Sequence, residues 1–320
     1  MSALASLLAA PPPDAAIEIA SEGVSVAALD VKGRDAVVRG YAVARLEPGV
    51  VVPRLSGSNI ADRGQVAAAI RAACERAGIR PRRAALVIPD VSARVSLVRF
   101  ERVPSRADDL EQLVRWQVKK SAPFPMEEAC VTYSPGAKSA GGHEFVVVVA
   151  RRDVVEEYEG ACSEAGVYAG LVDLSTLSVV NLLLGAGAVP AADWLVVHVR
   201  PEYASIAVMR AEDLIFFTNR AEDDPDALAD VVHQTAMYYQ DRLAGQGFSR
   251  VFLGGHGRNP SAVATARRDL EQRLATVVEP IESTRAATLG EGVPVAPAVM
   301  ATLAPLVGIL VRWSREAVHA

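Results

Sequence analysis

Apolar and polar positions follow a plan that the chain repeats in its two halves. Each half has three short apolar runs separated by polar turns, then a stretch with helical spacing, then one more apolar run. In the first half these segments are residues 16–20, 24–29, 36–44, 65–77 and 85–88. In the second half they are residues 194–199, 204–209, 214–217, 226–243 and 251–253. The repeat predicts two β-β-β-α-β lobes, and ligands often bind in the cleft between two lobes.

The segment between the two halves departs from this plan. Apolar runs that indicate strands lie at residues 96–100, 129–133 and 144–150. A helix with acidic residues in its first turn and Lys119-Lys120 in its last precedes the second of these runs, a charge order that suits the helix dipole. A further helix is predicted over residues 153–165. We therefore predict an inserted α+β subdomain.

These patterns predict a duplicated α/β protein with three regions. The first lobe is expected at residues 14–95 and 168–188, the insert at residues 96–167 and the second lobe at residues 193–320. A chain of 320 residues exceeds the usual size of a single hydrophobic core, which agrees with more than one domain.

Composition and charge narrow the classes of function. Residues are 51% hydrophobic and 22% charged, which is typical of a globular protein, and the formal net charge is −5. No run of lysine or arginine stands out, which argues against nucleic acid as a partner. Cys74, Cys130 and Cys162 are widely spaced and form no disulfide framework, as expected in a reducing compartment.

The standard catalytic and metal-binding motifs are absent from the sequence. The five histidines show no paired metal spacing such as HExxH, so we predict no metal site. Neither a GxSxG nucleophile elbow nor a GxxxxGK[ST] phosphate loop occurs.

One uncharged stretch near the C-terminus is almost long enough to span a bilayer. It covers residues 293–311, but Pro294, Pro297 and Pro305 interrupt it. We expect a buried helix that starts after Pro297, in preference to a membrane span.

The two-lobed repeat resembles the actin, sugar-kinase and heat-shock-ATPase superfamily, a duplicated ribonuclease H-like fold. In that superfamily the turn after the first strand of each lobe faces the nucleotide phosphates, an acidic residue there helps to hold magnesium, and a later glycine turn accepts the adenosine. The resemblance implies ATP with magnesium as the candidate cofactor. The positions that correspond in this sequence are Glu18, Ser21 and Gly23 in the first turn, His198 and Ser205 in the second, and Gly254, Gly255 and Gly257 in the third.

The first two turns depart from the superfamily pattern. Ala20 replaces a glycine, and Glu22 places a negative charge near the phosphates. In the second turn His198 replaces the acidic residue, Arg200 replaces a glycine, and Pro201 removes a backbone donor. These departures put ATP binding in doubt, so both a degraded site and a working ATPase stay open.

Four segments together resemble PilM-type pilus-assembly proteins, which are similar to the cell-division protein FtsA and to the cytoplasmic region of the secretion subunit GspL. The segments are residues 83–100, 113–125, 172–177 and 238–243, and the second, which reads LVRWQVKKSAPFP, is the most specific.

The resemblance implies a cytoplasmic scaffold beneath the inner membrane. It implies that the chain grips the N-terminal peptide of a PilN-type inner-membrane subunit, in a groove between the first lobe and the insert, and that it contacts the pilus motor ATPases. Two alternatives stay open: an active ATPase whose lobe closure regulates assembly, and a GspL-like component of type II secretion.

Three residues at one corner of the insert are candidates for partner binding. Trp116 and Phe124 offer large apolar contact areas, and Lys120 could steer an acidic or carbonyl-bearing segment. The alternative is that both aromatic rings pack inside the insert itself.

Overall fold

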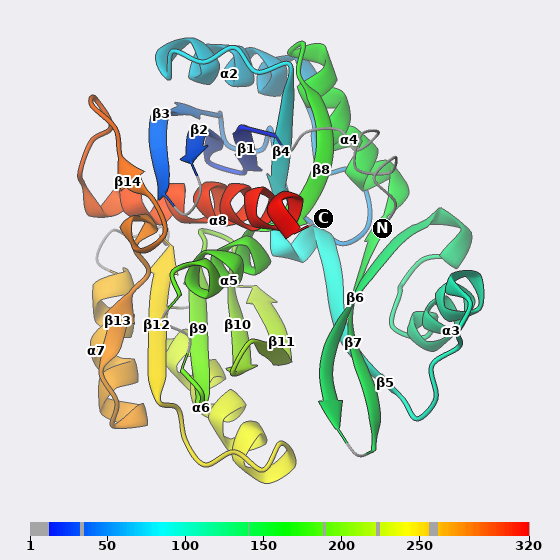
Figure 1. Cartoon of the computed structure of the whole chain (residues 1–320). Coiled ribbons are helices and arrows are strands. Elements are labelled where there is room, and N and C mark those ends of the chain that lie inside the picture. Colours follow the sequence, from blue (N-terminus) through cyan, green and yellow to red (C-terminus); the bar gives the residue numbers. More distant parts are fainter. Residues whose placement is uncertain are drawn as a thin grey trace.

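Layers of helices and sheets alternate through the molecule, with a small subdomain attached at one side (Figure 1). The computed structural model describes residues 13–32, 35–139, 141–187, 190–221, 225–255 and 262–319. Within these residues the layers run in the order helices, sheet, helices, sheet, helices.

The first lobe is built on a six-stranded sheet with the order β14-β3-β2-β1-β4-β8. Its strands are β1 (Ala15–Ala20), β2 (Gly23–Lys32), β3 (Asp35–Arg45), β4 (Arg83–Ile88), β8 (Tyr168–Leu174) and β14 (Thr288–Leu289). All six residues of the central β1 are buried because helices cover both faces of the sheet. Ile17 and Ile19 face the outer helices α2 (Arg63–Arg76) and α4 (Arg152–Glu164), whereas Ala16 faces the inner helices.

The second lobe repeats this arrangement. Its sheet has the order β11-β10-β9-β12-β13, which matches β3-β2-β1-β4-β8 strand for strand. The strands are β9 (Asp193–Val199), β10 (Tyr203–Arg210), β11 (Asp213–Ala221), β12 (Arg250–Gly255) and β13 (Val278–Pro280). Helices α6 (Pro225–Arg242) and α7 (Ala262–Leu274) cover the outer face. The predicted two-lobed duplication is therefore present.

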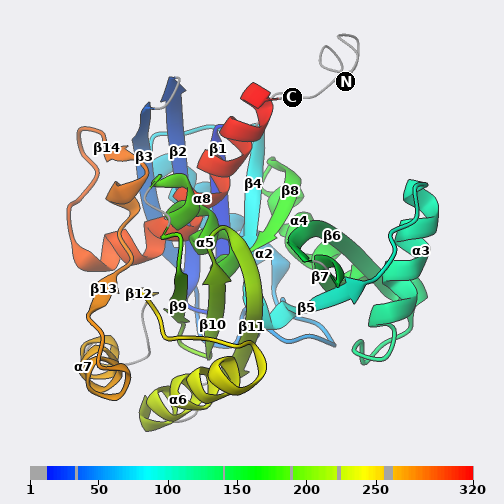
Figure 2. The same ribbon diagram turned by 60° about the horizontal axis from the view of Figure 1, so that its bottom comes forward.

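Two helices form a layer that both sheets share (Figures 1 and 2). These are α5 (Ser175–Gly185) and α8 (Pro297–His319). One continuous core joins Leu182 of α5 and Leu306 of α8 to Ala85 of the first sheet and to Trp194 and Val196 of the second. The interface between the lobes is consequently a hydrophobic core and not a loose hinge.

The insert is a three-stranded sheet covered by one helix. Its strands are β5 (Ala93–Phe100), β6 (Ala129–Ser139) and β7 (Gly142–Arg151), in the order β5-β7-β6, and its helix is α3 (Ala107–Val118). Val114 and Val118 of α3 pack with Phe145 and Val147 of β7 in a small separate core.

One helix differs from the sequence-based expectation. Helix α4 was expected inside the insert, but Tyr158 and Cys162 lie in the core of the first lobe, as α7 does in the second. Helix α8 starts at Pro297 as expected and runs through Pro305 to His319. Among the described residues, none of the helices meets the length and hydropathy needed to cross a membrane.

Candidate functional site

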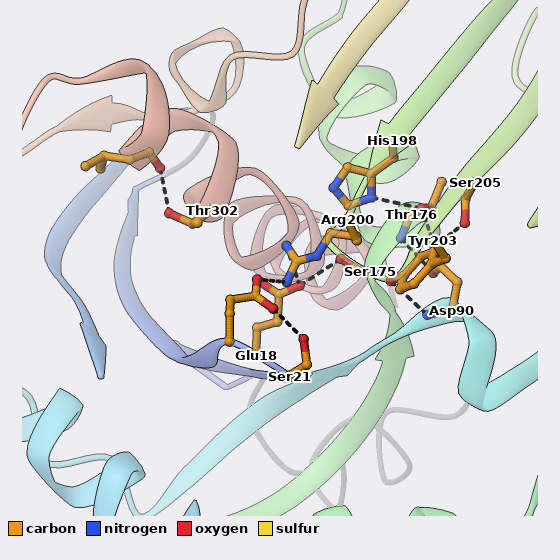
Figure 3. A network of polar contacts seen from close by, with 12 residues as sticks. Glu18, Ser21, Asp90, Ser175, Thr176, His198, Arg200, Tyr203, Ser205 and Thr302 are labelled. Carbon is orange, nitrogen blue, oxygen red and sulfur yellow. Dashed lines mark hydrogen bonds and ion pairs between the residues drawn. The ribbon is translucent and has the colours of Figure 1, made fainter. Parts of the chain in front are cut away.

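The crevice between the lobes is occupied by the chain's own charged side chains (Figure 3). Arg200, in the turn between β9 and β10, is 3% exposed and points from the second lobe to the first. Its Nη1 lies 3.4 Å from Oε1 of Glu18, and its Nη2 lies 3.0 Å from Oε1 of Glu22. The two turns that resemble phosphate loops are therefore joined by ion pairs.

The two glutamates keep Arg200 charged in spite of its burial. Burial alone lowers the pKa of Arg200, but the carboxylates of Glu18 and Glu22 outweigh this and raise it above its ordinary value. Glu18 is 2% exposed, and its Oε1 also accepts a hydrogen bond of 2.8 Å from Ser175 Oγ. Ser21 Oγ donates to Glu202 Oε1, which adds a second contact between the two turns. We call the set Glu18, Ser21, Glu22, Arg200 and Glu202 the clasp.

A second buried cluster beside the clasp centres on Asp90. This carboxylate is completely buried and accepts from the Thr176 backbone N–H (2.9 Å), the Thr176 hydroxyl and the Ser205 hydroxyl (2.6 Å). Burial raises its pKa, and the hydrogen bonds from Ser205 and Thr176 oppose the shift. Because Ser205 belongs to the second lobe, Asp90 also links the lobes.

The cluster determines how His198 is protonated. Thr176 has a single hydroxyl proton, which it donates to Asp90. With Asp90 ionised, the 2.9 Å contact between Thr176 Oγ1 and His198 Nδ1 therefore has His198 Nδ1 as the donor. His198 is 1% exposed, so it presents no free ring nitrogen to solvent at this position.

At the glycines expected to approach a nucleotide, the surrounding backbone and side chains leave no room for a Cβ atom. Gly255 has φ +96°, and a Cβ there would lie 1.9 Å from the backbone oxygen of Val199. A Cβ on Gly254 would meet the Ile281 side chain at 2.6 Å, and one on Gly23 would meet the Ala44 oxygen at 2.5 Å. Gly257 lies outside the described residues.

A cavity of about 640 Å³ adjoins the first turn. Its polar lining includes Ser21, Glu22, Glu202, Arg45 and Thr302, and Thr302 is hydrogen-bonded to Tyr41. Within the described part of the chain, no group of His, Cys, Asp and Glu side chains is arranged to hold a metal ion.

A separate groove of about 450 Å³ lies between the insert, the inner helices and the hairpin of β10 and β11. We call it the insert groove. Its apolar lining comes mainly from Leu177, Val180 and Leu184 of α5, with Val146 of β7 and Leu214 of β11. Glu212 and Asp213 supply carboxylates at the hairpin.

The three predicted partner-binding residues lie on or next to α3 and are not brought together in one pocket. Trp116 is 71% exposed, so it does not pack inside the insert. Phe124 is half-buried against the core of the insert, which favours the packing alternative for this ring. Lys120 is exposed, and none of the three lines the insert groove.

Sequence reasoning missed Asp90, Thr176 and Tyr203. Asp90 lies two residues after the end of β4, Thr176 lies two residues after the end of β8, and these strands are parallel neighbours. Polar residues at the carboxyl ends of adjacent parallel strands meet at one edge of a sheet, which was the available signal. Tyr203 had no such signal: its hydroxyl accepts from the Asp90 backbone N–H at 3.1 Å, across the lobes.

Comparisons with known proteins agree with this architecture. No curated protein is significantly similar to the sequence. A solved PilM-PilN type IV pilus biogenesis complex contains a chain with TM-score 0.80 and 15% identity, over 94% of this chain and 98% of that one. A Bacteroides thetaiotaomicron protein with an actin-like ATPase fold and unknown function has TM-score 0.52 and 10% identity, over 86% and 91% of the two chains.

These structural similarities establish the actin-like fold. The model of the family described as type IV pilus assembly protein PilM matches residues 16–222, which include the insert, the first three strands of the second lobe and the first lobe apart from β14. Because this match covers more than half of the sequence, the chain belongs to the PilM family of type IV pilus assembly proteins.

Proposed function

We propose that the chain is a non-catalytic adaptor of the type IV pilus machine. It holds the N-terminal peptide of a PilN-type inner-membrane subunit and contacts the motor ATPases, on the cytoplasmic side of the inner membrane. The family match and the similar PilM-PilN complex support a PilN-type partner.

The buried Arg200 in the crevice is the main support for the proposal that the chain is non-catalytic. A magnesium triphosphate needs a carboxylate free for the metal and amides free for the phosphates. Glu18 is paired with Arg200, and Pro201 in the second turn has no N–H. Glu22 and Glu202 line the adjoining cavity and would repel phosphates. The residues present therefore do not fit magnesium ATP.

The insert groove has the chemistry to hold an N-terminal peptide. The N-terminal peptide of a protein carries a positive α-amino group, with a pKa of about 8, ahead of its side chains. Glu212 and Asp213 can pair with that amino group, while Leu177, Val180 and Leu184 can bury apolar side chains. The groove also lies between the insert and the inner helices, so a bound peptide would contact both.

Fluorescence anisotropy with the PilN-type peptide, labelled at its C-terminal end, tests the proposal. We expect saturable binding to the full chain, and about fivefold weaker binding for Glu212→Gln/Asp213→Asn. Acetylation of the peptide N-terminus should weaken binding to the unmodified chain by a similar factor. The acetylated peptide should bind the variant and the unmodified chain with equal affinity, because it lacks the amino group with which the two carboxylates would pair.

A matched control removes the same charge elsewhere. Asp108→Asn/Asp109→Asn neutralises two exposed acids on α3, outside the insert groove, and should leave peptide affinity within about twofold. Trp116→Ala tests the alternative surface on α3. If Trp116→Ala abolishes binding while the acidic pair has no effect, the peptide binds at α3 and the groove assignment is wrong.

A further inference from the structure

A third cavity, of about 420 Å³, lies where the three parts of the molecule meet. Val91 comes from the first lobe, Arg94 and Ser96 come from β5 of the insert, and Thr218 and Arg220 come from β11 of the second lobe. Cavities of several hundred cubic ångströms are the usual size for small-molecule ligands.

Among the described residues, the lining of this cavity carries positive charge without a carboxylate to balance it. Arg94 and Arg220 are both exposed, and neither has an ion pair with any of the described residues. No Asp or Glu of the described residues lines the cavity, whereas the hydroxyls of Ser96 and Thr218 do. Two guanidinium groups that share one cavity repel each other unless an anion lies between them.

The surroundings add to the positive charge. Ser121, at the end of α3, also lines the cavity and directly follows Lys119 and Lys120, which are exposed. An anion that approaches this part of the molecule is therefore attracted before it reaches the two arginines.

We propose that this cavity binds a small phosphorylated molecule with at least two negative charges. Guanidinium groups pair with phosphate oxygens through two parallel hydrogen bonds, so Arg94 and Arg220 can each hold one phosphate group. The neutral hydroxyls of Ser96 and Thr218 can donate to the remaining oxygens. This site is separate from the crevice and from the insert groove, and it stands whether or not the chain is a pilus adaptor.

Binding would connect the insert to the second lobe. Arg94 belongs to the insert and Arg220 to β11, and Asn219 beside Arg220 donates from Nδ2 to the backbone oxygen of Asp90 at 3.3 Å. A ligand held by both arginines therefore bridges the insert and the second lobe next to the Asp90 cluster. It should stabilise the folded chain by mass action.

Calorimetric titration of the full chain with inorganic pyrophosphate, without magnesium and at low ionic strength, tests the site. We expect one saturable binding event, at least about tenfold weaker in Arg94→Gln and in Arg220→Gln. Arg102→Gln, which removes an exposed charge outside the cavity, should change the affinity by less than about twofold. The affinities of Arg94→Lys and Arg220→Lys should lie between those of the unmodified chain and the glutamine variants, because lysine keeps the charge but cannot form two parallel hydrogen bonds.

Several outcomes would overturn the proposal. The first is the absence of saturable heat with pyrophosphate, and the second is an equal loss of affinity in Arg102→Gln. Saturable binding of a glutamate-rich peptide without binding of pyrophosphate would show that the cavity is a protein docking surface. The melting temperature of each variant without ligand shows whether it is folded. If a glutamine variant does not fold, the lysine variant at the same position, which keeps the charge, still tests the site.

Discussion

The Arg200 side chain brings a positive charge into the lobe interface, where it meets Glu18 and Glu22. Taking charges out of water costs several kcal/mol per ion, and pairing recovers this only when the partners remain in place. The clasp therefore stabilises the lobe interface only while all its charges are present, and removing one of them should destabilise the folded chain.

Replacement of Arg200 by methionine should lower the free energy of unfolding by about 3 kcal/mol, because Glu18 is left buried without its cation. The double variant Glu18→Gln/Arg200→Met should recover part of this loss, since no unpaired charge then remains at Glu18. Urea denaturation at neutral pH measures both. An Arg200→Met protein as stable as the unmodified chain would mean that the clasp does not hold the lobes.

A second prediction concerns the ion pairs at β13. Hydrogen bonds from Arg250, and more weakly Arg285, lower the pKa of Glu279 from 4.5 to about 2. Because the pKa is lower in the folded state, the ionised Glu279 contributes stability above pH 4.5, and this is lost as the pH falls through 2. Glu279→Gln should cost about 1 kcal/mol at neutral pH after solvent screening.

The measurement is chemical denaturation across the acid range. The difference in stability between Glu279→Gln and the unmodified chain should shrink as the pH falls from 4.5 toward 2. A difference that stays constant through this range would show that the Glu279 carboxylate contributes nothing by its charge.

The candidate site could be predicted only in part at the residue scale. The sequence marked Glu18, Ser21, His198 and Ser205 as candidate nucleotide-binding residues, because each lies at a turn or strand of the repeat, and in the structure all four lie beside the crevice. It also marked Arg200 as a departure from glycine. The pairing of Arg200 with Glu18 could not be predicted, because no local pattern connects residues that lie in different lobes.

Helices α5 and α8 pack closely against each other at Gly308. A Cβ on Gly308 of α8 would lie 1.8 Å from the backbone oxygen of Ser178 in α5. Any side chain at this position would push the two inner helices apart. The spacing of the shared layer, and with it the distance between the two sheets, depends on this one glycine.

Gly308→Ala should therefore destabilise the chain by about 3 kcal/mol. Gly64→Ala is the matched control, because it makes the same change in α2, where the added Cβ would meet its nearest atoms at 3.4 Å. Gly64 lies in the first turn of α2, so alanine there should change the free energy of unfolding by less than about 0.5 kcal/mol. Thermal and urea unfolding should therefore show a large loss for Gly308→Ala and little change for Gly64→Ala, and equal changes would contradict the close packing of α5 and α8.

The elements themselves were largely predictable, because their hydrophobic periodicity is local. The limits of α2, α6 and β9 agree with the predicted segments to within a few residues. The assignment of α4 failed because an apolar face shows that a helix is buried without showing which sheet covers it. The buried helix expected after Pro297 is α8, and Pro305 lies inside it without ending it.

For the whole molecule, the two sheets share one helical layer and one hydrophobic core. Opening the crevice would expose part of that core and would also break the ion pairs of the clasp. Opening would therefore carry an energetic cost in both the shared core and the clasp. We predict that titration with ATP and magnesium gives no binding heat in a calorimeter, whereas micromolar binding with turnover would support the ATPase alternative.

The most direct test of the account compares peptide binding with and without nucleotide. Anisotropy titrations of the PilN-type peptide should be made with the full chain alone, with magnesium and with magnesium ATP. The account predicts the same affinity in all three conditions, because the clasp already holds the lobes together. Binding that requires ATP, or that changes by tenfold or more when ATP is added, would contradict it.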